Sequence, residues 1–221
     1  MKAHIVHYKK LVQRRAAMER QLGWEGIEAD FVDQFDRDMV RIEDVSLFDR
    51  RRVPWRFRRR MPDVQVVITL SHLHCLRQIA HSGRWGLILE DDAILAPGFR
   101  AGLERCLDQL PDGWGMLFLG DGCGLHIPED RLRGGVVVYP KEREPTDWGG
   151  DGATRCTDSY VVHPDCAAAV IALLQALPRP IDRPIDWWLN EVIRHLRIDV
   201  YWAEPTLATQ GSQVTGGTSS Y

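Results

Sequence analysis

The stretch Trp85-Gly86-Leu87-Ile88-Leu89-Glu90-Asp91-Asp92 decides the fold class of this chain. Its first part is a continuous apolar run, the pattern of a strand buried on both faces of a sheet, and it ends abruptly in three acidic residues. Strand side chains alternate, so Glu90 and Asp92 would project to one side. Because ligands bind beyond the carboxyl ends of strands in open α/β sheets, a functional site is expected at these acids.

Apolar strand candidates alternate with amphipathic helices along the rest of the chain. This alternation is typical of an α/β sheet with helices on both faces. Glycine-rich stretches at residues 120–124 and 149–152 are expected to form loops around a site. Strands are predicted over residues 3–7, 64–70, 85–89, 116–119, 135–139, 159–163 and 198–203, and helices are predicted to begin near Val12, Ser71, Pro97, Pro164 and Pro184.

Length and composition predict one folded domain. The chain has 221 residues, of which 44% are hydrophobic and 27% charged, and we expect a single domain over residues 1–210 with a flexible tail over 211–221. The formal net charge of −3 does not predict binding to nucleic acid or membranes by the chain as a whole. No apolar run approaches the roughly 20 residues of a transmembrane helix, and no signal peptide is evident.

The five cysteines include no C-x-x-C pair, so neither a disulfide framework nor a structural zinc site is indicated. We interpret them as buried thiols of a cytoplasmic protein.

The carboxylate pair Glu90 and Asp92 offers hard oxygen ligands to Mn²⁺ or Mg²⁺, which could bridge a diphosphate. The alternative interpretation is a strand end with solvated acids, or a cap supplied by Asp91 or Asp92 to the next helix. The position directly after a fully apolar strand favours a functional site.

Three further residues could contact a phosphate. Arg14 carries a permanent charge and can bond two oxygens at once, and Ser71 and His72 are predicted at a helix N-terminus, which favours anions. The alternatives are a solvated helix position for Arg14, a plain N-cap for Ser71 and a core histidine bonded to the backbone for His72.

Asp186 is a candidate general base because it lies beside Trp187, whose ring could stack on a sugar face. An aspartate in the first turn of a helix is also favourable without any catalysis. Asp151 and Asp158, in or near the second glycine-rich loop, are alternative bases. Trp188 is expected in the core because it belongs to the apolar stripe of its helix.

The chain also contains a dense arginine run at residues 50–60, with seven arginines, two aromatic residues, one valine and one proline. A run of this kind is usually a solvated face. It would also suit a polyanionic acceptor bound by Arg58 and Arg59, such as lipopolysaccharide core phosphates or nucleic acid.

Five short motifs follow one another along the chain: Arg14-Arg15-x-x-Met18, Leu70-Ser71-His72, Leu89-Glu90-Asp91-Asp92, Ser159-Tyr160-Val161-Val162, and Pro184-Ile185-Asp186 followed by Glu204-Pro205-x-Leu207-x-x-Gln210. Their order resembles glycosyltransferase family 25, which includes lipopolysaccharide β-galactosyltransferases and procollagen galactosyltransferases. The resemblance covers roughly residues 3 to 211. The family usually has Ile-Asn-Leu at the end of the first strand, where this chain has Val6-His7-Tyr8.

The resemblance implies a GT-A fold, with a Rossmann-like central mixed sheet flanked by helices, and a nucleotide-sugar donor. Carried over to this sequence, it implies that Arg14 and Glu90 contact the nucleotide and that Asp91 and Asp92 hold the metal and diphosphate. His7, Ser71 and His72 are the other donor contacts implied.

The function expected from the sequence is metal-dependent transfer of a hexose from a nucleoside diphosphate sugar, with UDP as the nucleotide, to a hydroxyl acceptor with inversion. The acceptor would be a glycan, a lipopolysaccharide or another hydroxyl compound. The rival hypotheses are transfer to a modified DNA base, a non-catalytic sugar-nucleotide or polyanion-binding module, and a metal phosphohydrolase.

Overall fold

The computed structural model describes residues 1–36, 38–41, 46–48, 61–122, 124–151, 153–176 and 180–211. The arginine run at residues 50–60 and the predicted tail beyond residue 211 lie outside the described residues. No helix in the described part of the chain is long and apolar enough to cross a membrane.

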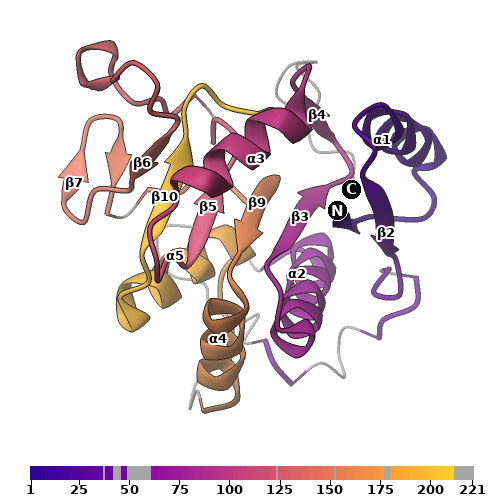
Figure 1. Cartoon of the computed structure of the whole chain (residues 1–221). Coiled ribbons are helices and arrows are strands. Elements are labelled where there is room, and N and C mark those ends of the chain that lie inside the picture. The colour runs from indigo at the N-terminus through magenta and orange to yellow at the C-terminus, as the bar shows by residue number, and fades with distance from the viewer. Residues whose placement is uncertain are drawn as a thin grey trace.

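A seven-stranded mixed sheet forms the centre of the molecule, in the order β2-β1-β3-β9-β5-β10-β6 (Figure 1). β1, β2 and β3 are parallel, β9 pairs antiparallel with both β3 and β5, β10 is parallel to β5, and β6 closes the sheet antiparallel to β10. This arrangement confirms the predicted α/β fold with a mixed central sheet. The strands are β1 (Lys2–Val6), β2 (Glu28–Val32), β3 (Gly86–Glu90), β5 (Met116–Phe118), β6 (Val138–Pro140), β9 (Ser159–Val162) and β10 (Val200–Ala203).

Helices cover both faces of the sheet, as the alternation of side chains along each strand requires. In β3, Leu87 and Leu89 belong to an apolar cluster with α1 and α3, and Ile88 belongs to the opposite cluster with α2, α4 and α5. Trp188 is buried in that second cluster, which confirms its predicted place in the core. The helices are α1 (Val12–Trp24), α2 (Asp63–Ser82), α3 (Phe99–Gln109), α4 (Pro164–Ala176) and α5 (Ile185–Leu196).

The predicted strand at residues 64–70 is wrong, because those residues form the first two turns of α2. The helix begins after Pro62, and Ser71 lies near its middle with its hydroxyl donating to the carbonyl of Val67. Ser71 and His72 are therefore not at a helix N-terminus. The β-branched run favours a strand locally, but residues from both halves of α2 pack with α4 and α5 in one apolar cluster, and this packing overrides the local preference.

Several strands were not predicted. β2 is an edge strand beside β1, and β4 (Ala93–Leu95) pairs with β11 (Ala208–Gln210) outside the main sheet. β7 (Pro145–Thr146) and β8 (Gly149–Gly150) form a small hairpin in the second glycine-rich stretch, where a Cβ on Gly149 would lie 2.2 Å from the ring of Trp202. A 3₁₀ turn, η2 (Glu129–Arg131), completes the regular elements.

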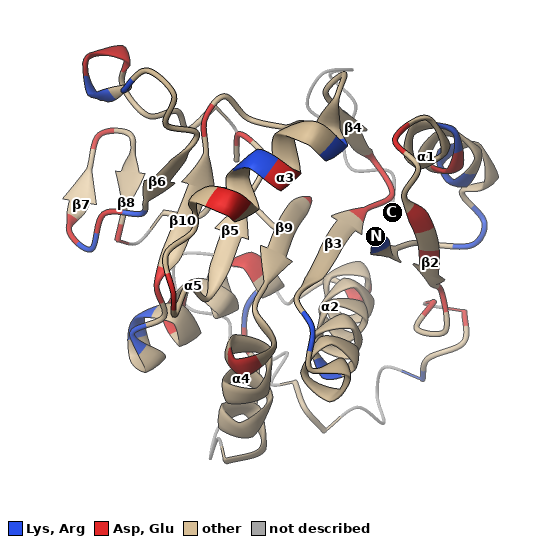
Figure 2. Cartoon of the chain, in the orientation of Figure 1, with Lys and Arg blue, Asp and Glu red and all other residues tan. Residues whose placement is uncertain are grey.

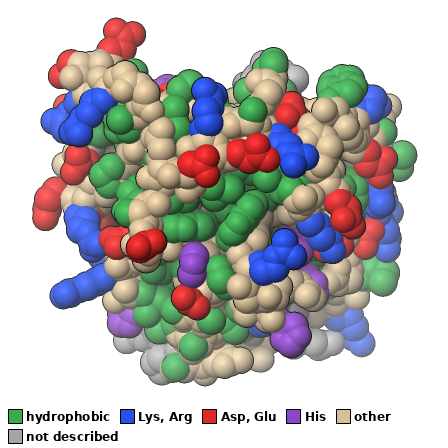
Figure 3. Space-filling model, viewed as in Figure 1, with side chains coloured by type: hydrophobic (Ala, Val, Ile, Leu, Met, Phe, Trp, Pro, Cys, Tyr) green, Lys and Arg blue, Asp and Glu red, His purple; other side chains and the backbone are tan. Residues whose placement is uncertain are grey.

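The described cysteines are thiols, as expected, but Cys156 is half-buried rather than buried. Cys75, Cys106 and Cys166 are buried, and burial raises the pKa of Cys106 to about 11, so these thiols stay protonated and unreactive. On the face drawn in Figure 3, basic and acidic side chains are interspersed, in keeping with the small net charge.

Candidate active site

The candidate active site lies along one edge of the sheet. The parallel strands β1, β3, β5 and β10 end there, and the antiparallel strand β9 begins there. Polar residues follow or precede these strand ends, and Figure 2 shows acidic residues at the end of β3 and at the start of β9. The buried polar residues at this edge are His7, Glu90, Asp91, Asp92, Thr157, Asp158, Ser159 and Glu204.

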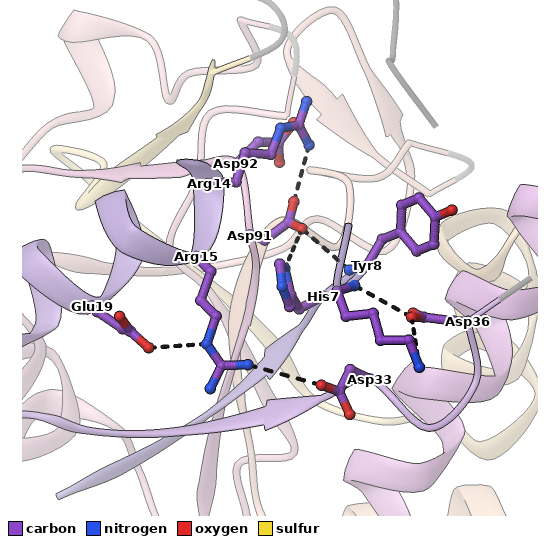
Figure 4. A network of polar contacts seen from close by, with 10 residues as sticks. His7, Tyr8, Arg14, Arg15, Glu19, Asp33, Asp36, Asp91 and Asp92 are labelled. Carbon is purple, nitrogen blue, oxygen red and sulfur yellow. Dashed lines mark hydrogen bonds and ion pairs between the residues drawn. The ribbon is translucent and has the colours of Figure 1, made fainter. Parts of the chain in front are cut away.

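Asp91 is the centre of a buried network at the ends of β1 and β3 (Figure 4). Its Oδ2 is 2.8 Å from Nδ1 of His7, and its Oδ1 accepts a hydrogen bond of 2.9 Å from Arg14. The Asp91 side chain is fully buried, whereas 22% of the Arg14 side chain is exposed. Asp91 therefore holds His7 and Arg14 in place, and Arg14 presents a permanent positive charge at the edge of the sheet.

Asp92 follows in the chain and lies 3.6 Å from the same Arg14 guanidinium through its Oδ2. The backbone carbonyl of Asp92 accepts a hydrogen bond of 2.8 Å from the N–H of Gly211, because β4 and β11 pair immediately beyond the acids. The C-terminal part of the described chain thus fixes the backbone of the acidic stretch.

Glu90 is held by a different set of groups. Its Oε1 accepts a hydrogen bond of 3.0 Å from the hydroxyl of Thr157 and lies 3.4 Å from Nε2 of His72. Nδ1 of His72 is 2.9 Å from the hydroxyl of Tyr160, and the two rings are stacked. His72 is a fully buried histidine that orients Glu90 from α2, with side-chain partners rather than the backbone partner of the alternative interpretation.

Two other carboxyl groups face this acidic edge. Burial and the negative charges of Glu90 and Asp92 raise the pKa of Asp158 to about 7. Burial, with a smaller contribution from Glu90, raises the pKa of Asp186 to about 6. Both groups therefore titrate close to neutral pH, which is the range in which a carboxylate can accept a proton and release it again.

Arg155 and Glu204 form a buried ion pair beneath the site. Arg155 donates to Oε2 of Glu204 at 2.9 Å and to the carbonyl of Ala203 at 2.8 Å, and its guanidinium lies 4.4 Å from the centre of the Trp202 ring. Its fully buried charge ties the chain before β9 to the end of β10. Gly122 lies against it, since a Cβ there would be 2.1 Å from the Arg155 Cα.

A small pocket, with a cavity volume of about 20 Å³, lies beside the ends of β1 and β2 and the first half of α2. Its lining is mostly apolar with a few polar groups, which is the usual character of a small-molecule site. Nε2 of His7 is buried and has no hydrogen-bond partner among the described residues. The lining residues are Val6, His7, Tyr8, Phe35, Asp36, Val64, Val67, Ile68 and Ser71.

Most of the site residues expected from the sequence meet at this edge, but not all. Asp151 lies elsewhere, because its carboxylate is paired with Arg194 at 3.0 Å and it lines a different pocket. Trp187 is half-buried at the start of α5, next to Asp186. Arg58 and Arg59 lie outside the described residues, so binding of a polyanionic acceptor by them stays a prediction.

The sequence interpretation missed Arg155 and Thr157 and did not assign roles to Glu204 and Tyr160. Glu204 and Tyr160 belong to the motifs that carry the family resemblance, so a signal for them existed. Arg155 had none beyond its place after a glycine-rich loop, since its partners Gly120, Ala203 and Glu204 are 35, 48 and 49 residues away in the chain.

Metal ligands were predicted among the acids after β3. In the described ranges, no three His, Cys, Asp or Glu side chains form a group that could hold a metal ion by themselves. The donor set is nevertheless chemically suited to a hard divalent cation, because the buried carboxylates of Asp92 and Asp158 lie at neighbouring strand ends. Mg²⁺ typically takes only one or two protein carboxylates and completes its coordination with water and substrate phosphates.

Comparisons with known proteins show which family the chain belongs to. Residues 1–124 match the family model described as glycosyltransferase family 25 (LPS biosynthesis protein). Among solved structures the chain is similar to mouse xyloside xylosyltransferase 1 in its apo form, with 12% identity, a TM-score of 0.43, and coverage of 89% of this chain and 70% of that chain. No curated protein matches the chain. Because the family match spans more than half of the chain and includes β1, β3 and the three acids after β3, this protein belongs to glycosyltransferase family 25 and is a glycosyltransferase.

Proposed function

We propose that the protein transfers a hexose from a nucleoside diphosphate sugar, with UDP as the nucleotide, to a hydroxyl acceptor, with inversion at the anomeric carbon. The observation that carries this proposal is the juxtaposition of a positively charged Arg14, a set of buried carboxylates and a mostly apolar pocket at one edge of the sheet. These are the groups that a diphosphate, a divalent cation and a nucleoside require.

The nucleoside would bind over the small pocket beside β1, and its cavity of about 20 Å³ would have to widen to admit the base. Tyr8 and the apolar side chains of α2 offer surface to a base, and Nε2 of His7 offers a hydrogen bond to a polar atom of the base or ribose. Because Asp91 holds both His7 and Arg14, a nucleoside on His7 would direct its phosphates toward the Arg14 guanidinium. The proposed donor orientation thus follows from one buried carboxylate.

A divalent cation, Mn²⁺ or Mg²⁺, would be held by Asp92 together with a second carboxylate. Asp91 was the second ligand expected from the sequence, but its oxygens contact His7 and Arg14, so Asp158 suits that role better. The cation would neutralise the negative charge that develops on the departing diphosphate. Arg14 would contribute to the same neutralisation with its permanent charge.

Asp186 is our candidate for the base that removes the proton of the acceptor hydroxyl. It projects from the first turn of α5, and the half-buried ring of Trp187 beside it could contact the acceptor sugar. With a pKa of about 6, Asp186 would be mostly ionised at pH 7 and still basic enough to accept a proton. Asp158 remains the alternative base, and Asp151 is disfavoured by its ion pair with Arg194.

Inverting transfer is a single displacement at the anomeric carbon. The acceptor oxygen attacks as Asp186 takes its proton, and the bond to the diphosphate breaks on the opposite face. No covalent sugar–enzyme intermediate is required, so only one carboxylate is needed on the acceptor side.

The direct test is a thermal-shift panel with UDP-glucose and UDP-galactose, each with Mn²⁺, with Mg²⁺ and with a chelator. A donor at 100 times its dissociation constant should stabilise the protein by about 2.7 kcal/mol, which raises Tm by roughly 5–10 °C for a domain of this size. The Asp92→Asn variant is the matched control and should show no metal-dependent increase. If no nucleotide sugar changes Tm with either metal, the proposed donor class is wrong.

Stereochemistry is tested separately by NMR of the product. The proposal expects a β-linked product from an α-linked donor, and an α-linked product would remove the role assigned to Asp186.

A further inference from the structure

A second pocket, with a cavity volume of about 290 Å³, lies outside the candidate active site. It is formed by the end of β6, the start of β10 and the last turns of α5, where Figure 2 shows basic and acidic residues close together. β10 begins at this pocket and ends at the acidic edge, so the two sites lie at opposite ends of the same strand. This volume is close to the lower limit of small-molecule sites.

Lys141 projects into this pocket and is held by neutral groups. Its Nζ donates to the carbonyl of Ala153 at 2.7 Å and to Oδ1 of the buried Asn190 at 2.6 Å. An ammonium group has three N–H donors, and the third has no partner among the described residues. Burial lowers the pKa of Lys141 to about 8, although the charge of Asp151 opposes that change.

The other charges of the pocket are largely paired. Arg143 is 2.6 Å from Asp199, and Arg194 is 3.0 Å from Asp151, so these two cations are neutralised within the pocket. Glu142 is paired with Arg131 at 3.7 Å.

Lys141 and Arg197 are the remaining cations that line the pocket. Within the described ranges, neither has a carboxylate at ion-pair distance, and both line the same cavity. Lys141 is largely buried, so its positive charge is costly without a carboxylate at ion-pair distance, and an anion that joins it to the exposed Arg197 would offset that cost.

We propose that this pocket is a second ligand site, which binds a phosphate monoester group of a small molecule between Lys141 and Arg197. The phosphate accepts the third N–H of Lys141 and the guanidinium N–H groups of Arg197, and the apolar part of the ligand contacts Ile193 and Tyr201. The site does not depend on the proposed transfer reaction, because none of its residues lies at the acidic edge.

A local chemical readout tests the proposal. Acetic anhydride at pH 7.5 will acetylate lysines of the native full-length chain, and mass spectrometry gives the rate at Lys141, with the exposed Lys2 as the internal control. Saturating inorganic phosphate or glucose 6-phosphate should slow acetylation of Lys141 about tenfold, as expected for an amine held in a charge-assisted hydrogen bond, and leave Lys2 unchanged. Glucose, which lacks the phosphate, should protect neither residue.

Variants then assign the binding by calorimetry with glucose 6-phosphate. Lys141→Gln and Arg197→Gln should each weaken binding about tenfold. Arg197 is exposed, so its variant tests the site without a risk to folding, and Arg20→Gln, on the exposed side of α1, is the matched control. The proposal is overturned if phosphate compounds leave the acetylation of Lys141 unchanged, if Lys141→Gln binds as the parent does, or if binding is lost in Arg14→Gln alone, which would place the phosphate in the donor site.

Discussion

Replacement of Asp186 by Asn should make the protein more stable and less active at the same time. The carboxyl group is largely buried on the first turn of α5, and its pKa is raised from the ordinary 3.8 to about 6. That difference corresponds to about 3 kcal/mol of free energy by which folding disfavours the ionised form. Asn has nearly the same shape and carries no charge, so the Asp186→Asn variant avoids this cost.

The helix dipole reduces the expected gain. An acidic residue in the first turn of a helix contributes roughly 0.3–1 kcal/mol, which Asn would lose. The net stabilisation at pH 7.5 is then about 2 kcal/mol, or an increase in Tm of roughly 4–8 °C for a domain of this size. In the same variant kcat should fall by about 10²-fold or more, since the general base is removed, with donor affinity little changed.

The pH dependence has a definite sign. Because the pKa of Asp186 is higher in the folded protein than in the unfolded chain, the folded state binds the proton more readily between about pH 4 and pH 6. The parent protein therefore gains stability from this group as pH falls through that window. The stabilisation of Asp186→Asn relative to the parent should reach its full value above pH 7 and should be absent near pH 4.

Urea unfolding of parent and variant at pH 7.5, 6, 5 and 4 measures this difference. Asp165→Asn is the matched control, because Asp165 is also in the first turn of a helix, α4, but its side chain is 94% exposed. That control should lose up to about 1 kcal/mol at pH 7.5 and retain full activity. If Asp186→Asn is less stable than the parent at pH 7.5, or if the stability difference does not change with pH, the buried charge of Asp186 does not destabilise the folded protein. Full activity of this variant would instead assign the role of base to Asp158.

Three further changes test other parts of the site. Asp92→Asn should keep the fold and abolish Mn²⁺-dependent binding of a UDP-sugar in calorimetry, and unchanged affinity would contradict its role as a metal ligand. Gly120→Ala places a Cβ 2.5 Å from Oδ2 of Asp158, so kcat should fall at least about tenfold while the circular dichroism spectrum stays unchanged. In the control variant Gly134→Ala, the Cβ meets no atom within 4 Å, and kcat should equal that of the parent. Serine at Arg58, Arg59 and Arg60 should raise KM for a polyanionic acceptor and flatten its salt dependence without a change in donor binding, whereas equal salt slopes would indicate a solvated face.

The central strand and the acids at its end could be predicted from the local sequence alone. A continuous apolar run that ends in Glu90, Asp91 and Asp92 predicts a buried strand. A strand covered on both faces must be apolar, and its end must lie in polar surroundings. The alternation of Leu87, Ile88 and Leu89 between two apolar clusters follows from strand geometry alone. Patterns of this kind involve only a few neighbouring residues, so they can be recognised in the sequence without knowledge of the fold.

Helix and strand could not be distinguished where the local preference and the packing disagree. The β-branched residues of the first half of α2 favour a strand, yet they continue the apolar face of Leu73 and Leu76 at helical spacing. The pairing of that face with α4 and α5 decides the outcome, and neither partner is nearby in the sequence. Most of the stability of a helix in a folded protein comes from such packing.

Which residues distant in the sequence share the site depends on the arrangement of the strands. The insertion of β9 antiparallel between β3 and β5 places Asp158 beside Glu90, and the end of β10 places Glu204 against Arg155. Strand order depends on how both faces of the whole sheet are covered by helices, which is a property of the complete chain and not of any segment. The acidic residues could therefore be identified from the sequence. The order of the strands places them together at one edge of the sheet, beside a pocket.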